Sequence, residues 1–186
     1  MFLFGCVNQF NDQFHLSNVV QQNIVSDSTE GDTLFRPAKI DYLKYAELVS
    51  QVDGMRRAKL VTLDTFLSMA KEHKTIILDT RSESMYRAKH IRGAVHLNFS
   101  DFSSYRLMNL IPDESTRILI YCNNNFFGDS YYFSLKSIEL ALNIPTYINL
   151  VGYGYENVYE LSELLDIDDE RLVFEGSAVN NTTSKK

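Results

Sequence analysis

The sequence predicts an α/β protein in which helices cover both faces of a parallel sheet. Two apolar runs rich in β-branched residues, TIILD (75–79) and RILIYC (117–122), are typical of strands buried on both faces. Segments with apolar residues at helical spacing stand between such runs, which is the order of βαβ units. The chain has 186 residues, enough for one domain of this class with additional terminal segments.

The first elements alternate helix and strand. Residues 40–52 place apolar residues at helical spacing, and Gly54 with the basic residues after it suits the end of that helix. KLV (59–61) is a short strand candidate. Thr62 suits the N-cap of a helix over residues 63–73.

The remaining elements continue the alternation on both sides of RILIYC. Before it, a short polar helix (82–90), a strand (93–98) and a helix capped by Ser103 are expected. After it come a helix over SLKSIELAL (134–142), a second beginning at Pro145, and a last strand, NVYEL (157–161).

Composition excludes several classes of protein. Hydrophobic residues make up 45% and charged residues 23%, as in soluble globular proteins. No apolar stretch approaches the ~20 residues of a transmembrane helix. The net charge of −6 argues against binding to nucleic acid or to an anionic membrane surface. No GxGxxG or GxxxxGK motif and no metal-ligand spacing occurs, so we expect no cofactor and no metal.

The termini are expected to lie outside the domain. Residues 1–39 are predicted to be an extension or linker, 40–175 a single domain, and 176–186 a disordered tail. The N-terminus, MFLFGC, leaves two interpretations open. It is an ordinary apolar segment of a cytoplasmic protein, or Leu3-Phe4-Gly5-Cys6 ends a truncated bacterial lipoprotein signal, which would export the protein and anchor it at Cys6.

Cys122 is the candidate nucleophile. It ends a predicted buried strand and precedes Asn123, Asn124 and Asn125, whose loop can direct backbone N–H groups at an anion. The alternative is a buried thiol at a strand end followed by a surface turn. Because functional groups gather at the carboxyl ends of parallel strands, Asp79 and Cys122 are expected at the same edge of the sheet.

A longer pattern resembles a known family. LDTRSESMYRAKHIRGAVHLNFSDF (78–102) resembles the first half of a rhodanese-like domain, RILIYC resembles the strand that delivers its active-site cysteine, and GYGYENVYEL (152–161) resembles a later strand. The resemblance covers roughly residues 58–165. The residues that carry the first match are Asp79, Arg81, Tyr86, His90, Ile91, Gly93, Ala94 and His96.

The resemblance implies a three-layer sandwich with a central five-stranded parallel sheet. It implies that Cys122 is catalytic and carries sulfur as a persulfide, that Asp79 and Arg81 support the site, and that His90 and Gly93 belong to a structural turn. The implied active-site loop, a YCNNNF variant, comprises Asn123, Asn124, Asn125, Phe126, Phe127 and Gly128.

The chain departs from the family pattern after the cysteine. No arginine or lysine occurs between Cys122 and Lys136, which disfavours phosphatase activity and efficient use of thiosulfate. Residues 126–144 look like an insertion over the site, whose aromatic residues form an apolar lid or a partner-binding edge, or simply pack the insertion onto the domain. Its aromatic residues are Phe126, Phe127, Tyr131, Tyr132 and Phe133.

Three functions therefore stay open. The first is a sulfurtransferase that exchanges sulfur with a small thiol or a protein acceptor. The second is a non-catalytic rhodanese-fold binding module, and the third is a thiol redox sensor. The sequence leaves the oligomeric state, the sulfur donor and the acceptor undetermined.

Overall fold

A five-stranded parallel sheet forms the centre of the structure, as the sequence predicted. The computed structural model describes residues 36–179, so the predictions for Cys6 and for most of both termini lie outside the described residues. The strand order is β1-β7-β5-β2-β4, and every neighbouring pair is parallel. The bounds are Leu60–Val61 (β1), Thr75–Asp79 (β2), Ala94–His96 (β4), Arg117–Tyr121 (β5) and Val158–Leu161 (β7).

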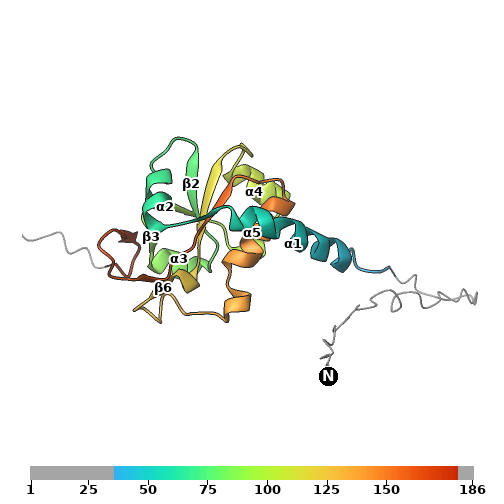
Figure 1. Cartoon of the computed structure of the whole chain (residues 1–186). Helices are drawn as coiled ribbons and strands as arrows, with labels where there is room; N and C mark the ends of the chain where they lie inside the picture. Colours follow the sequence, from blue (N-terminus) through green and yellow to red (C-terminus); the bar gives the residue numbers. More distant parts are fainter. Residues whose placement is uncertain (1–35, 180–186) are drawn as a thin grey trace, which may run out of the picture. The chain divides into compact units, whose positions relative to one another are not determined.

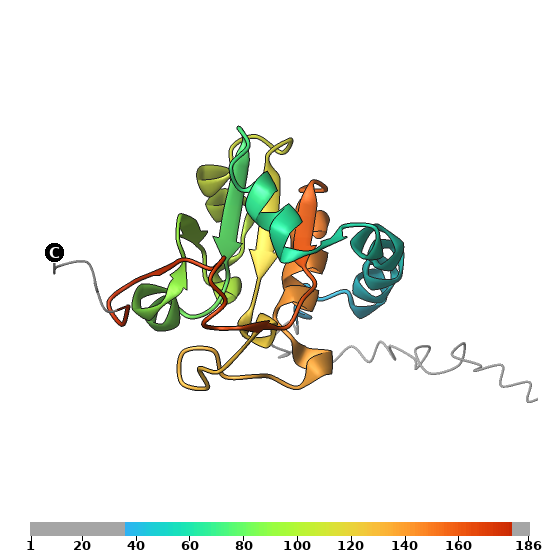
Figure 2. The ribbon, with the colours of Figure 1, turned by 60° about the vertical axis from the view of Figure 1, so that its left-hand side comes forward.

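Within residues 36–179, α-helices lie on the two sides of this sheet (Figures 1 and 2). Their bounds are Tyr42–Arg57 (α1), Leu63–Met69 (α2), Glu83–Ala88 (α3), Ser104–Leu110 (α4) and Asn143–Gly152 (α5). No helix within residues 36–179 is both long and apolar enough to cross a membrane.

Alternate side chains of the central strand β5 enter two separate cores, as the period of two requires. Leu119 and Tyr121 pack in a cluster that includes residues of α2. Ile118 and Ile120 pack in a second cluster that includes residues of α1, α4 and α5. The sheet is therefore buried on both faces, which explains the near-continuous apolar runs of β2 and β5.

The predicted N-caps are confirmed. The hydroxyl of Thr62 accepts a hydrogen bond from the backbone N–H of Thr65 at 3.4 Å, and Ser103 accepts from Arg106 at 3.3 Å. The first helix begins after Asp41 and runs through Gly54 to Arg57, further than predicted. It therefore carries Arg56 in its last turn, next to β7.

The predicted helix over SLKSIELAL is wrong. Only a single 3₁₀ turn forms there, at Ile138–Leu140. Leu135, Ile138 and Leu140 are 62%, 77% and 73% exposed, so the apolar residues that suggested a helix have no core to pack against. A short helix in water is marginal without such packing.

Four two-residue strands and two further 3₁₀ turns were not predicted. They are β3 (His90–Ile91), β6 (Phe126–Phe127), β8 (Leu165–Asp166), β9 (Phe174–Glu175), and the turns at Phe99–Asp101 and Asn123–Asn125. β3 pairs antiparallel with β9, and β6 pairs parallel with β8. NVYEL is thus the last strand of the main sheet but not of the chain.

The expected turn residues occupy a turn. The Nδ1 atom of His90 lies 2.6 Å from the carbonyl oxygen of Tyr86, and Gly93 has a φ of +80°, which favours glycine. Past β9, the backbone N–H groups of Ser177 and Ala178 donate to carbonyl groups at the end of α3. The chain is therefore still tied to the domain at these residues.

Candidate functional site

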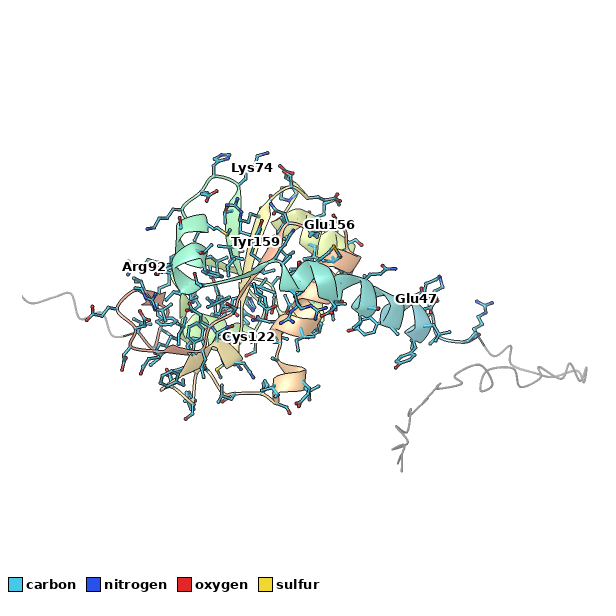
Figure 3. The ribbon with its side chains drawn as sticks, in the orientation of Figure 1. Glu47, Lys74, Arg92, Cys122, Glu156 and Tyr159 are labelled. Carbon is cyan, nitrogen blue, oxygen red and sulfur yellow. The ribbon has the colours of Figure 1, made fainter. Side chains whose placement is uncertain are left out.

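Cys122 lies directly after β5, at the carboxyl edge of the sheet, inside the body of the domain (Figure 3). Its side chain is on the face that α1 and α5 cover, because it follows Tyr121, which points to the other face. The residue is only 1% exposed. It is the only cysteine within residues 36–179, and its thiol is free.

The three asparagines after Cys122 are held in two different ways. The Nδ2 group of Asn123 donates to the carbonyl of Ser134, and that of Asn124 donates to the carbonyl of Lys136, both at 2.8 Å. These bonds attach the loop to the inserted segment. The loop is therefore not a free surface turn.

Asn125 is the buried member of the three and joins the loop to the sheet. Its Oδ1 atom accepts from the backbone N–H of Cys122 at 2.9 Å and from Nδ2 of Asn143 at 3.1 Å. Its Nδ2 group donates to the carbonyl groups of Leu161 and Glu163 at 2.8 and 3.1 Å. One side chain thus fixes the start of the loop, the end of β7 and the start of α5.

Two opposing influences act on the Cys122 thiol. Burial is the larger and raises its pKa, and the negative charge of Glu160 acts in the same direction. The backbone N–H groups of Asn143, Asn124 and Leu142 favour the thiolate and lower the pKa, but they do not outweigh burial. The resting thiol is therefore neutral at pH 7.

A cavity of about 220 Å³ adjoins the thiol. Besides Cys122, its lining includes Arg56 of α1 and Glu160 of β7. These two form a bidentate ion pair, with Nε–Oε2 at 2.6 Å and Nη2–Oε1 at 2.7 Å. Burial opposes the charge on Arg56, but the hydrogen bonds to Glu160 are the larger effect and raise its pKa. The cavity therefore holds one fixed positive and one fixed negative group beside the sulfur.

Asp79 and Arg81 lie on the opposite face of the sheet from the Cys122 side chain. Arg81 donates to the Asp79 carboxylate through Nε and Nη2, the latter at 2.6 Å, and the pair is almost fully buried. Tyr121, the residue before the cysteine, donates its hydroxyl to Asp79 at 2.5 Å. The predicted support residues are thus connected to Cys122 through its neighbour, and no direct hydrogen bond joins them among the described residues.

Arg81 has little capacity left to bind an anion. It also donates to the carbonyl groups of Lys89 and Tyr132, at 2.7 and 3.0 Å, and its guanidinium lies 4.3 Å from the ring centroid of Phe133. Burial alone would lower its pKa, but the bonds to Asp79 leave it raised. This residue ties α3, the insertion and the sheet together.

The aromatic residues of the insertion divide into a buried group, an exposed group and the half-buried Tyr132. Phe126 and Phe133 are fully buried and pack on Phe174, so this part of the segment is attached to the α2 core. Phe127 and Tyr131 are exposed. Neither group lines the cavity beside Cys122, so the aromatic side chains do not close over the thiol.

A second cavity, of about 490 Å³, lies on the other side of the loop. Thr80, Asn98 and Asn123, which follow β2, β4 and β5, are in its lining. The carboxyl edge of the sheet is therefore hollowed on both sides of the Cys122 loop, as expected of this fold class. No group of three metal-ligating side chains gathers within the described residues.

Arg56 and Glu160 were missed in the sequence. Glu160 did leave a signal, because it is the charged residue of a predicted buried strand, and a buried charge requires a partner. The sequence gives no such signal for Arg56, since basic residues are common at a helix C-terminus, where they interact favourably with the helix dipole.

The fold and the site define an α/β protein with a cysteine at the carboxyl end of its central parallel strand. The family model of the rhodanese-like domain matches residues 62–163, more than half of the chain. The chain belongs to the rhodanese-like domain family. The match begins after α1, so Arg56 comes from outside it.

Three solved structures are similar to this chain at low identity. The BH2092 protein from Bacillus halodurans has 16% identity over 61% of this chain and 74% of its own, with a TM-score of 0.43. A thiosulfate sulfurtransferase from Pseudomonas aeruginosa has 17% identity and a TM-score of 0.43 over 64% of this chain, which spans only 20% of that protein. An E. coli rhodanese with anions has 17% identity over 55% of this chain and 98% of its own, with a TM-score of 0.36. No curated protein sequence matches the chain.

Proposed function

We propose that the protein is a sulfurtransferase that carries sulfur as a persulfide on Cys122, within the variant loop YCNNNF. One observation carries the proposal: Cys122 stands directly after β5, within the segment that the rhodanese-like family model matches, and it lines a cavity of about 220 Å³. The backbone amides of Asn143, Asn124 and Leu142 lower the pKa of its thiol and would favour a thiolate or a persulfide anion at this position.

The transfer needs no oxidant. The Cys122 thiolate attacks the outer sulfur of a donor persulfide, R–S–SH, and a bond forms between Sγ and that sulfur. The donor's S–S bond breaks, its electron pair stays on the donor sulfur, and the proton lost by Cys122 converts that sulfur to a thiol. A thiol or protein acceptor then removes the outer sulfur in the same way.

Thiosulfate is a poor candidate for the donor. Arg81 is saturated by Asp79 and by carbonyl groups, and Arg56 is neutralised by Glu160. The carboxylate of Glu160 would also repel a dianion in so small a cavity. A donor with no net negative charge suits the site better.

Intact-protein mass spectrometry with residue mapping tests the proposal. The full-length Cys6→Ser variant is treated with hydrogen disulfide, desalted and then offered a thiol acceptor. We expect one sulfur atom on Cys122 that the acceptor removes, and none on the matched Cys6→Ser/Cys122→Ser protein. A Cys122 that stays unmodified while a small thiol in the same tube is persulfidated overturns the proposal.

The burial of Cys122 favours a second candidate, a non-catalytic binding module. A thiol that is 1% exposed and has a raised pKa reacts slowly, and the exposed apolar residues of the insertion offer a surface for a protein partner. This candidate requires that Cys122→Ser leave the cellular function intact, and loss of that function on Cys122→Ser excludes it. The third candidate, a thiol redox sensor, also needs a thiolate, so the raised pKa of Cys122 disfavours it as much as it disfavours an unliganded sulfurtransferase.

A further inference from the structure

The cavity beside Cys122 presents three chemically different groups to whatever enters it: a sulfur, a guanidinium and a carboxylate. They come from three separate parts of the chain, namely the loop after β5, the last turn of α1 and the strand β7. A ligand suited to this cavity would react with the sulfur and pair with both charged groups.

The guanidinium of Arg56 is only partly used. Nε and Nη2 each donate one hydrogen bond to Glu160, and among the described residues no hydrogen bond involves Nη1. The Arg56 side chain is 26% exposed and lines the cavity. A guanidinium has five N–H donors, which leaves donors for a second carboxylate without breaking the ion pair.

The carboxylate of Glu160 is similarly placed. Each oxygen accepts one hydrogen bond from Arg56 and retains further acceptor capacity. Because the two charges cancel, the cavity offers no net attraction to an anion or to a cation. It favours a molecule that itself carries one charge of each sign.

We propose that this cavity binds a small zwitterionic α-amino thiol that carries an outer sulfur, such as a cysteine persulfide, with its carboxylate on Arg56 and its ammonium group on Glu160. The inference rests on the proposed function and names its donor. The volume of about 220 Å³ is below the ~300–1,000 Å³ of drug-sized ligand sites and suits a molecule of amino-acid size.

Such a ligand would also activate the cysteine. The negative charge of Glu160 is one cause of the raised pKa of Cys122. An ammonium group placed against Glu160 offsets that charge, so the pKa of the thiol falls when the donor is bound. A bound donor would thus increase the fraction of Cys122 that is ionised beside the sulfur it attacks.

The test uses analogues that cannot transfer sulfur. S-methylcysteine carries both charges, S-methylcysteamine lacks the carboxylate and methylthiopropionate lacks the ammonium group. Each is titrated into the full-length protein, and the backbone amide signals of Asn124 and Ser162, which line the cavity, are followed by NMR. We expect S-methylcysteine to bind at least about tenfold more tightly than either half, since each half loses one charge-assisted contact.

Variants assign the contacts. Arg56→Gln should weaken binding of S-methylcysteine and methylthiopropionate, which carry a carboxylate, and spare S-methylcysteamine. Glu160→Gln should weaken binding of S-methylcysteine and S-methylcysteamine, which carry an ammonium group, and spare methylthiopropionate. If either single variant unfolds, the double variant Arg56→Gln/Glu160→Gln leaves no lone buried charge and should bind all three compounds equally weakly.

The outcomes separate this inference from the proposed function. Equal binding of the three analogues, or none at all, overturns the zwitterion site, and transfer from hydrogen disulfide to Cys122 would leave the proposed function standing. Selective binding of S-methylcysteine without any sulfur transfer to Cys122 supports the site and overturns the proposed function.

Discussion

Replacing Asn125 should destabilise the protein far more than replacing its neighbour Asn124. Asn125→Ala removes four hydrogen bonds and leaves the backbone N–H of Cys122 and the carbonyl of Leu161 without these partners in a buried region. At a net ~0.5–1.5 kcal/mol for each of the four bonds, the loss of unfolding free energy is about 2–6 kcal/mol.

Asn124→Ala is the matched control. It also removes hydrogen bonds, to the backbone carbonyl and N–H of Lys136, but both lie in an exposed region where water replaces them. The expected loss is about 1 kcal/mol or less. Urea denaturation of both variants, followed by circular dichroism, measures the difference. Equal losses for the two variants would refute the role of Asn125 as the anchor of the loop.

Three further predictions concern the buried polar groups. The pKa of Cys122 is raised in the folded protein, whereas an unfolded cysteine titrates near ~8.5. The wild type should therefore lose stability relative to Cys122→Ser as the pH rises above ~8.5, and not below it. The same raised pKa predicts that the alkylation rate of Cys122 has no inflection below ~8.5, and an inflection near pH 7 would contradict it. Arg81→Ala should lower the unfolding free energy by about 3–5 kcal/mol, since it leaves the Asp79 carboxylate buried without its cation. A loss under about 1 kcal/mol in urea denaturation would show that the ion pair is dispensable. Tyr147→Phe should leave the stability unchanged or raise it by up to ~1–2 kcal/mol, because the buried hydroxyl of Tyr147 has no hydrogen-bond partner among the described residues. A clear loss of stability in thermal unfolding would mean that the hydroxyl is hydrogen-bonded in solution.

The sequence by itself determined the sheet, because its signals are local. TIILD and RILIYC each contain an unbroken apolar run, residues 76–78 and 118–122, which is typical of a strand covered on both faces. Thr62 and Ser103 sit where a side-chain oxygen can cap the following turn, and both do so. The same local rules failed over residues 134–142, since a helical pattern forms a helix only where a core is available to bury it.

Tertiary structure alone decided the surroundings of the cysteine. Three consecutive asparagines are equivalent in sequence, yet Asn125 is buried among β7 and α5 while the other two hold the insertion. Asp79 and Cys122 end neighbouring strands, but the offset of one position along β5 turns Cys122 to the opposite face from Asp79. The charges beside the sulfur come from Arg56 and Glu160, which are distant in sequence and meet only because α1 packs along β7. Such long-range placement follows from packing, which no local pattern encodes.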